Sequence, residues 1–512
     1  GGTTATATTT TQTVTSDATE VLAVSGHGWG HGLGLSQWGA YGYALHGLDY
    51  ERILAHYYQG TTLGPAPART VRVLLGSGKR LTLTSVSPWR AVDAQGTKVA
   101  LDAGTVALTR TAKLAGRALT LPLTFSAVAP LQVNGNVYRG RISVSLSGKT
   151  LQAVDVVALE SYLRGVVPAE VPSAWPAAVL QAQAVAARSY ALANLVKGRS
   201  FDLYGDVRDQ VYGGVGVESP ATDAAVAATK GQVLLYAGKV ADTLYFSTSG
   251  GRTASASEFG PAIPYLVSVS DPYDTTSPYH DWGPVLFPAA SVAKRLKVAS
   301  PLNDIETSAS ASGRVQTVTV VGGDGLAATF TGPQVRTALD LRSTWFAPSL
   351  LGLSARTTGI TYGGAASLEG IARAAGAVSL EAQRYGQDWQ PAGALQPGTD
   401  GTFSTIVKPQ LRTAYRLAAG AVRVSLVTVS VSARCDATIT SSGATGTLRP
   451  ASAGAVQLQR GGSGAWTTVS STLADAAGAF SFGGPLAPGD YRARCAPGAG
   501  IAPGLSAEAM LP

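Results

Sequence analysis

The residue best suited to acid–base chemistry is Glu170, which stands between two prolines in the run VVPAEVPSAWPAAVLQAQAVAARSY. The prolines restrict the backbone on either side and favour an extended conformation around the acid. Strong helix formers without Gly or Pro follow over residues 177–196 and predict a long helix, with Ser173 as its cap and Pro176 in its first turn. A carboxylate held rigidly at the mouth of a helix suits proton transfer, which requires placement within hydrogen-bond range. Taken alone, such an acid more often only complements the helix dipole.

The elements that must position this acid form an α+β core. Upstream, apolar residues fall at helical spacing within a helix predicted over residues 40–59. Short alternating strands, separated by glycine turns, follow over residues 70–152 and predict a β-rich lobe. The long helix comes next, and a mixed region of strands and loops continues to residue 346.

Composition narrows the class of protein. The 512 residues are enough for three or four domains. The formal charge is +8, but the basic residues are spread along the chain without interleaved aromatic residues, which argues against nucleic-acid binding. No uninterrupted apolar stretch reaches the roughly 18 residues of a membrane span, so none is expected. A mild positive charge suits an anionic polymer as partner.

Two features indicate a secreted protein. The chain begins GGTTATATTTTQTVT, and residues 1–20 are expected to be a Thr-rich linker exposed after removal of a signal peptide. The two cysteines, Cys435 and Cys495, lie near opposite ends of one small β domain, a placement typical of a disulfide in an oxidising compartment. A pair of buried free thiols is the alternative.

The run around Glu170 resembles the signature of the SpoIID/LytB family, which comprises the stage II sporulation D proteins and the amidase enhancers. Further segments match this family in kind: Gly26–Gly60 (GHGWGHGLGLSQWGAYGYALHGLDYERILAHYYQG), Asp209–Gly214 (DQVYGG), Tyr245–Thr253 (YFSTSGGRT), Pro264–Trp282 (PYLVSVSDPYDTTSPYHDW) and Thr331–Phe346 (TGPQVRTALDLRSTWF). The resemblance therefore covers residues 25–346.

The chain also departs from the family pattern. The segment of residues 26–60, called the Gly-His block below, usually closes the domain in this family, whereas here it comes first. Such a permutation costs little if the two ends of the domain lie close together. Leu35 stands in the usual Met position, Phe246 where many relatives have His, and Gln181 where many have Lys.

The resemblance implies a lytic transglycosylase that acts on peptidoglycan strands from which the stem peptides have been removed. In that mechanism one carboxyl group protonates the glycosidic oxygen and then, as a carboxylate, accepts the proton of the C6 hydroxyl that attacks C1. A 1,6-anhydro end results, and one acid serves both steps. By the residue match this acid is Glu170. The resemblance also makes Arg188 a catalytic-site residue that positions the acid or binds a sugar carboxylate, with a helix-surface salt bridge as the alternative.

Several polar residues within the matching segments are expected to contact the glycan: Gln181, Tyr190, Gln210, Tyr212, Ser247, Ser249, Gly250, Gly251, His27, His31 and Gln37. In the loop Ser247–Gly251, glycines allow a ligand to approach closely and hydroxyls suit sugar hydroxyls, although a tight turn between strands is the alternative. Glu258, Asp271 and Asp274 matter for a different reason. If one of them faced Glu170 at a suitable separation, ordinary hydrolysis would become possible.

The Gly-His block also raises the question of a metal. His27 and His31 have a spacing that can bind zinc on a helix, but the glycines around them argue for a loop. His56 and His280 do not lie at a spacing from this pair that is typical of metal ligands. We therefore expect no metal and no cofactor, and assign these histidines to sugar contacts or a structural role.

An internal repeat follows residue 346. It predicts two all-β sandwich modules, residues 347–432 and 433–512, that resemble the immunoglobulin-like appendages of secreted bacterial enzymes. The repeat aligns Gly370 with Gly446, Trp389 with Trp466, Phe403 with Phe480 and Tyr415 with Tyr491. We expect these aromatic residues to pack in the module cores, although glycan binding is the alternative. The domains before them are the linker 1–20 and a SpoIID-like domain, 21–346, divided into 21–64, 70–152 and 153–346.

Two functions remain open from the sequence. The first is a secreted, cell-wall-associated lytic transglycosylase. The second is a non-catalytic wall-binding protein that stimulates an N-acetylmuramoyl-L-alanine amidase, as the name of some relatives implies. Both predict peptidoglycan glycan strands as a partner, the second adds a cell-wall amidase, and a monomer is expected in either case. A link to sporulation follows only from the family name.

Overall fold

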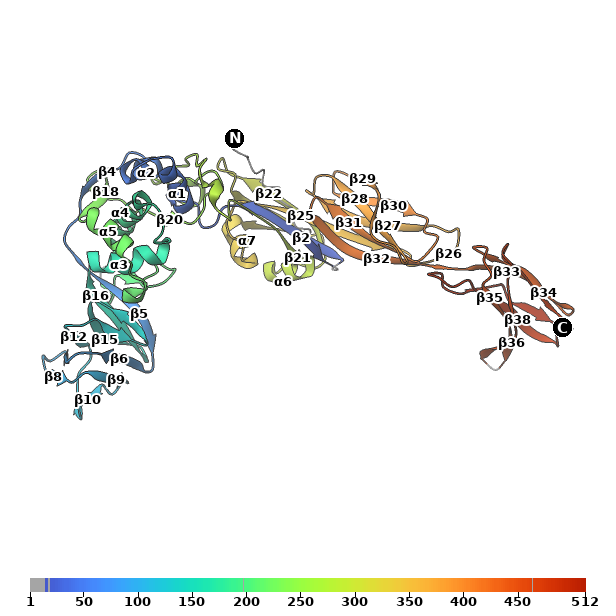
Figure 1. The fold of residues 1–512 in the computed structure, drawn as a ribbon, viewed down its shortest axis with the longest axis horizontal. Helices are drawn as coiled ribbons and strands as arrows, with labels where there is room; N and C mark the ends of the chain where they lie inside the picture. The colour runs from blue at the N-terminus through green and yellow to red at the C-terminus, as the bar shows by residue number, and fades with distance from the viewer. Residues whose placement is uncertain (1–13, 17–18, 197, 463) are drawn as a thin grey trace, which may run out of the picture.

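The computed structural model describes residues 14–16, 19–196, 198–462 and 464–512, and Figure 1 shows them as an elongated chain of units. A β lobe and a helical region lie at one end of the view, and the last β module lies at the other. Most of the linker predicted over residues 1–20 lies outside the described residues. Its residues Val14–Ser16 form strand β1, which pairs in parallel with a strand near residue 422. No helix in the described ranges is long and apolar enough to cross a membrane.

The alternating segment after residue 70 folds into the β lobe. A seven-stranded sheet runs β17 (Leu203–Tyr204), β5 (Thr70–Gly78), β16 (Thr150–Ala158), β15 (Arg141–Ser147), β12 (Leu123–Ala127), β7 (Trp89–Val92), β8 (Lys98–Leu101). A four-stranded sheet runs β14 (Asn136–Tyr138), β13 (Leu131–Val133), β6 (Leu81–Ser85), β9 (Gly104–Leu108), and β10 (Lys113–Leu114) pairs with β11 (Arg117–Ala118). Inward residues of both sheets share one core, which extends onto the neighbouring helices.

The helical region surrounds one central helix. Its helices are α1 (Gln37–Leu45), α2 (Tyr50–Tyr57), α3 (Leu159–Glu170), α4 (Ala177–Ala193) and α5 (Pro220–Ala228). Its short strands are β3 (Leu35–Ser36), β4 (Thr62–Pro65), β18 (Gln232–Tyr236), β19 (Lys239–Val240) and β20 (Tyr245–Phe246), and its 3-10 turns are η1 (Gly214–Val217), η2 (Ala256–Glu258) and η3 (Asp274–Thr276). Helix α4 is buried on two faces: Val179 and Val185 pack with α1 and α2, whereas Leu180 and Ala187 pack with the core of the β lobe.

Two helix predictions need correction. The single helix expected over residues 40–59 is two helices, because Gly47 takes a positive φ of 84° and Asp49 caps α2 by accepting a hydrogen bond from the Arg52 N–H. The long helix ends at Ala193 rather than at residue 196. Ser173 does not cap it, since Pro176 holds the N-cap position without a side-chain bond.

A five-stranded sheet joins the N-terminus to the first sandwich. It runs β21 (Asp281–Pro288), β2 (Glu20–His27), β25 (Phe346–Ala355), β27 (Ala366–Arg373), β30 (Thr402–Val407). One face packs on a sheet of β1, β32 (Val422–Ser432), β31 (Thr413–Ala419), β28 (Val378–Arg384) and β29 (Gln390–Leu395), with β26 (Gly359–Thr361) beside β32. The other face packs on α6 (Ala289–Leu296), α7 (Gly332–Leu339) and the sheet β22 (Leu302–Ala309), β23 (Val315–Gly322), β24 (Ala327–Thr331).

The run of apolar residues in β2 explains its central place. Val21 and Ala23 point into the sandwich core, while Leu22 and Val24 point into the core beneath α6. Alternate residues of a strand face opposite ways, so a strand covered on both sides must be apolar throughout. The boundary expected after residue 346 falls at the start of β25, in the middle of this sheet. The N-terminal strand of the expected SpoIID-like domain therefore shares a sheet with the first tail module.

The second tail module is a separate sandwich. Its sheets are β33 (Arg434–Thr440), β34 (Gly443–Arg449), β37 (Ala479–Gly483), and β36 (Ala465–Leu473), β35 (Ala455–Gly462), β38 (Gly489–Ala496), β39 (Gly504–Leu505), with β40 (Ala509–Leu511) beside β38. The predicted disulfide is confirmed: Cys435 of β33 bonds to Cys495 of β38 and so joins the two sheets. The fold is thus mostly β sandwich with few helices.

Candidate active site

Glu170 is the last residue of α3, with Pro168 inside the helix. The extended backbone predicted around this acid is therefore wrong. Leu163, Val166 and Val167 on the same helix are fully buried, and their packing offsets the hydrogen bond that the proline cannot donate. The helix stops directly after the acid, at Val171.

The carboxylate of Glu170 is partly exposed and accepts hydrogen bonds from three directions. The backbone N–H of Val211 donates to Oε1 over 2.9 Å, and the side chains of Tyr245 and Gln37 supply the others. Burial raises the pKa of Glu170, and these hydrogen bonds oppose the rise without cancelling it. A raised pKa keeps a carboxyl group protonated closer to neutral pH, which general acid catalysis requires.

A chain of hydrogen bonds orients Tyr245 toward the acid. The Tyr162 hydroxyl donates to Oε1 of Gln210 over 3.1 Å, and Nε2 of Gln210 donates to the Tyr245 hydroxyl over 2.8 Å. The lone pairs of Tyr245 thus face Gln210, so its proton is directed at Glu170. Burial raises the pKa of both tyrosines, so both remain protonated donors.

Gln37 reaches Glu170 from the Gly-His block. Strand β3 pairs in parallel with β20, with Leu35 opposite Tyr245, and α1 begins immediately afterwards at Gln37. Nε2 of Gln37 also donates to Oε1 of Gln183 on α4 over 3.4 Å, across 146 residues of sequence. The block at the start of the chain therefore lies against the acid.

Arg188 is not brought to Glu170. Its guanidinium is fully buried and forms a two-pronged ion pair with Glu160, with distances of 3.0 Å from Nε and 2.8 Å from Nη2. Nη1 donates to the carbonyl of Gln232 over 3.1 Å. Apart from a bond of 3.5 Å to the Ala184 carbonyl within α4, its hydrogen bonds in the described part of the chain link α4 to α3 and to the segment around α5 and β18. Arg188 therefore has a structural role between these helices and, contrary to what the resemblance implied, does not lie at the acid.

Other predicted glycan contacts divide between the acid's neighbourhood and the core. Tyr190 packs its ring against Tyr245 at 6.4 Å and donates to Asp209 over 3.0 Å, so it lies near the acid. Tyr212 is buried and donates to Asp155 over 2.8 Å, which is a core contact. Gln181 is half-buried on α4 and, by helical spacing, shares the face of Arg188 rather than that of Tyr190.

The polar loop of residues 247–251 wraps around a carboxylate. Ser249 Oγ donates to Asp274 Oδ2 over 2.8 Å, and the Gly250 N–H donates to the same oxygen over 2.6 Å. The Gly251 N–H lies 3.3 Å from that oxygen as well. Ser247 contributes its carbonyl, which accepts from the Trp38 N–H. Internal hydrogen bonds thus occupy most of the loop predicted to contact sugar.

The remaining carboxylates are also bound within the fold. Glu258 accepts hydrogen bonds from Ser310 and Ser312. Asp271 accepts from the Tyr57 hydroxyl, and burial together with the charge of Asp274 raises the pKa of Asp271 to about 6. Their contacts give neither residue a role opposite Glu170.

His27 and His31 do not converge on one point. Nδ1 of His27 lies 2.6 Å from Asp281, whereas Nδ1 of His31 accepts the Leu33 N–H over 3.0 Å and its Nε2 faces the Tyr245 carbonyl. Burial lowers the pKa of His31 to about 4, so it is a neutral ring at pH 7. No three His, Cys, Asp or Glu side chains among the described residues gather as metal ligands.

Sequence reasoning missed three features near the acid. Tyr245 lies within one of the matching segments, but nothing in its local sequence marks it as a contact of the acid. Gln183 lies in an Ala-rich helix, where an amide at a buried position is the available signal. The third is an aromatic cluster: Trp38, Tyr41 and Trp175 are partly exposed, with ring centres 4.9–5.6 Å apart. Trp38 follows Gln37 directly in the sequence, and Trp175 lies five residues after Glu170.

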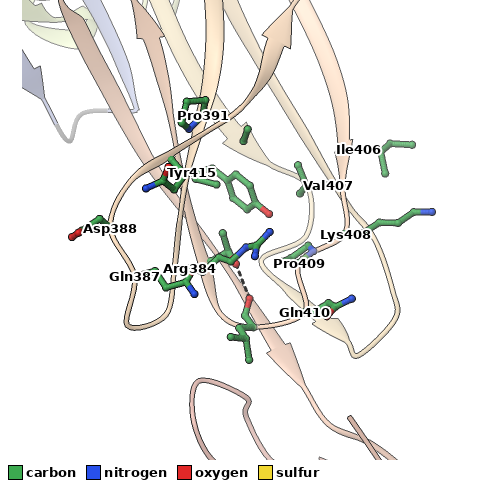
Figure 2. A pocket seen from close by; sticks show the side chains of 15 residues that line it. Arg384, Gln387, Asp388, Pro391, Ile406, Val407, Lys408, Pro409, Gln410 and Tyr415 are labelled. Atoms are coloured by element: carbon green, nitrogen blue, oxygen red, sulfur yellow. Dashed lines mark hydrogen bonds between the residues drawn. The ribbon is translucent and has the colours of Figure 1, made fainter. Parts of the chain in front are cut away.

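A cavity of about 750 Å³ lies elsewhere, in the first tail module (Figure 2). Its lining residues all fall between Ala382 and Tyr415, so it includes none of the predicted site residues. The ring of Tyr415 points into it, and Arg384 and Lys408 stand around it. This cavity is separate from the acid.

Comparison with known proteins gives a partial match. Residues 147–236 match the family model SpoIID, described as Stage II sporulation protein. The chain is 36% identical over 141 residues to an uncharacterised protein of Brachyspira hyodysenteriae, covering 27% of this chain and 38% of that protein. It is 34% identical over 140 residues to the amidase enhancer of Bacillus subtilis, covering 27% of this chain and 19% of that protein. It is 33% identical over 176 residues to the stage II sporulation protein D of the same organism, covering 31% of this chain and 51% of that protein. The chain thus spans about half or less of the length of each relative.

Proposed function

Because the chain belongs to the SpoIID/LytB family, we propose that it acts on the cell wall, as a lytic transglycosylase of peptide-stripped peptidoglycan strands. The observation that carries this proposal is the state of Glu170: partly exposed, with a raised pKa, and fixed by hydrogen bonds from Val211, Tyr245 and Gln37. A positioned carboxyl group of this kind suits an acid that must also act as a base.

In the proposed reaction, Glu170 donates its proton to the glycosidic oxygen as the bond from that oxygen to C1 of the muramic sugar breaks. The resulting carboxylate accepts the proton of the C6 hydroxyl while the C6 oxygen bonds to C1. The products are a 1,6-anhydro end and a free hydroxyl on the leaving sugar. Tyr245 and Gln37 stabilise the carboxylate between the two steps, because both donate to it. No second carboxylate is needed.

The permuted Gly-His block has a defined part in this proposal. Through the pairing of β3 with β20 it delivers Gln37 to the acid, which is the contact that a block at the other end of the domain would have to make. Trp38, next to Gln37 in the sequence, and Trp175, five residues after Glu170, offer apolar ring faces on which a sugar ring can stack. Such an enzyme would work outside the cell, on the wall.

The test uses the full chain, its Glu170→Gln variant and a matched control, Glu51→Gln, which removes an exposed carboxylate on α2. Each is incubated with peptide-stripped glycan strands, and the products are analysed by mass spectrometry. We expect anhydro-muramic ends from the wild type and the control, and none from Glu170→Gln. Reducing ends instead would refute the lytic mechanism and indicate a hydrolase.

A second candidate function is stimulation of a cell-wall amidase, favoured by the 34% identity to a protein named amidase enhancer. In that case the wild type would bind strands without cleaving them. Adding the chain to an N-acetylmuramoyl-L-alanine amidase on intact wall would then raise the release of stem peptides, and Glu170→Gln would raise it equally.

A further inference from the structure

The two tail modules repeat one surface arrangement. The guanidinium carbon of Arg416 lies 4.0 Å from the centre of the Trp389 ring, and that of Arg492 lies 4.1 Å from the centre of the Trp466 ring. The sequence repeat aligns the two tryptophans, and each arginine directly follows an aligned tyrosine, Tyr415 or Tyr491. We call each pair with its surrounding residues an Arg–Trp patch.

Strand alternation places both patches on the outside. Tyr415 and Tyr491 are buried, and Figure 2 shows the Tyr415 ring pointing into the module. The next residue along a strand points the opposite way, so Arg416 and Arg492 face outward. Core packing was predicted for all the aligned aromatics. It holds for both tyrosines and for Phe403 and Phe480, but it is wrong for the tryptophans, which are partly exposed.

Each arginine is held in the same way. Its Nε donates to a side-chain oxygen directly across the strand pair, to Glu381 over 2.8 Å in the first module and to Gln459 over 3.0 Å in the second. Glu381 stands opposite Arg416 in the register of β28 and β31, as Gln459 stands opposite Arg492 in that of β35 and β38. Among the described residues, the Nη groups of Arg416 have no hydrogen-bond or ion-pair partner. In Arg492, Nη1 forms an ion pair with Glu508 at 3.8 Å and Nη2 has no such partner.

Each patch contains a second arginine. Arg423 pairs with the other oxygen of Glu381 over 2.8 Å, and Arg494 donates to Gln457 over 3.2 Å. The first patch therefore has two positive arginines and one negative residue, Glu381. The second has two against Glu508, which lies 3.8 Å from Arg492. The first patch carries one positive charge in excess beside its aromatic ring. In the second patch Asp490 lies on the same face of β38 as Arg492 and beside Trp466, so the charges of the two arginines are balanced by Glu508 and Asp490.

We propose that the two patches bind a single acidic glycan strand, one sugar unit at each patch. The identity of the strand rests on the proposed function: a peptide-stripped wall strand carries a free carboxylate on every muramic sugar. A guanidinium with free Nη groups binds a carboxylate through two parallel hydrogen bonds, and an indole offers its apolar surface to a sugar ring. Two such contacts on one chain reinforce each other, because the second binding event is intramolecular. The modules then hold the strand that Glu170 cuts.

The test measures binding without cleavage. The full chain carrying Glu170→Gln is titrated with peptide-stripped strands, and the added changes are Arg416→Gln, Arg492→Gln, or both. We expect each single change to weaken binding about tenfold, as for loss of a charge-assisted contact. The double change should weaken it about a hundredfold, because the free-energy losses at the two well-separated patches add. The matched control, Arg356→Gln with Arg434→Gln, removes two exposed arginines from the same modules and should leave binding nearly unchanged.

Changes to the ligand avoid any question of misfolding. Strands whose carboxylates have been converted to neutral amides should bind the unaltered patches as weakly as natural strands bind the double variant. Thermal unfolding of each variant checks that the modules remain folded. Equal affinity of the double variant and its control, or no effect of amidation, would overturn the inference. Absence of cleavage by the wild type would refute only the proposed activity, because binding is measured separately.

Discussion

Replacing Arg188 with methionine separates a structural role from a catalytic one. The guanidinium is fully buried and forms a two-pronged pair with Glu160, whose side chain is 31% exposed. Breaking a buried ion pair by removing one partner costs about 3–5 kcal/mol. Water can reach Glu160, so we expect the lower end of that range, a loss of about 3 kcal/mol. The methionine side chain fills most of the space that the arginine leaves.

The assay combines urea unfolding with glycan cleavage measured per folded molecule. We expect a lower unfolding midpoint for the helical region and unchanged cleavage by the molecules that stay folded. Adding Glu160→Gln should restore part of the loss, because it replaces the unpaired carboxylate with a neutral amide. The control Arg52→Met removes an arginine that is 75% exposed and should change stability by less than about 1 kcal/mol. Lost cleavage at unchanged stability would refute this reasoning and return Arg188 to the active site.

Two predictions concern protonation. Tyr245→Phe removes a hydrogen bond that lowers the pKa of Glu170, so that pKa should rise further. The alkaline limb of the pH–rate profile should therefore move to higher pH. A shift to lower pH would show that Tyr245 does not stabilise the carboxylate. Burial lowers the pKa of His31 from 6.5 to about 4, so the unfolded chain takes up the proton first and stability is lost as pH falls between these values. His31→Asn lacks this loss. The difference in unfolding free energy between wild type and variant should therefore change by up to about 3 kcal/mol between pH 6.5 and about pH 4. A constant difference would show that His31 does not titrate over this pH range.

Local patterns in the sequence identified several features of this protein. The ordered segments indicated the family, and alternating apolar residues indicated the β lobe and the tail strands. The positions of Cys435 and Cys495 within one small β domain predicted their disulfide. Each of these inferences depends on propensity, periodicity or composition within a short stretch, which the chain carries before it folds.

Tertiary structure alone decided the surroundings of the acid. Glu170 ends a helix because packing of Leu163 and Val167 outweighs the local effect of Pro168. Gln37 reaches the acid only through the pairing of β3 with β20, and a strand pairing between distant segments leaves no local signal. Arg188 lies on a face of α4 that meets Glu160, and Arg416 and Arg492 of the tail face outward because they alternate with buried tyrosines along their strands. A sequence specifies which residues can do chemistry, but burial and long-range contacts determine which of them meet.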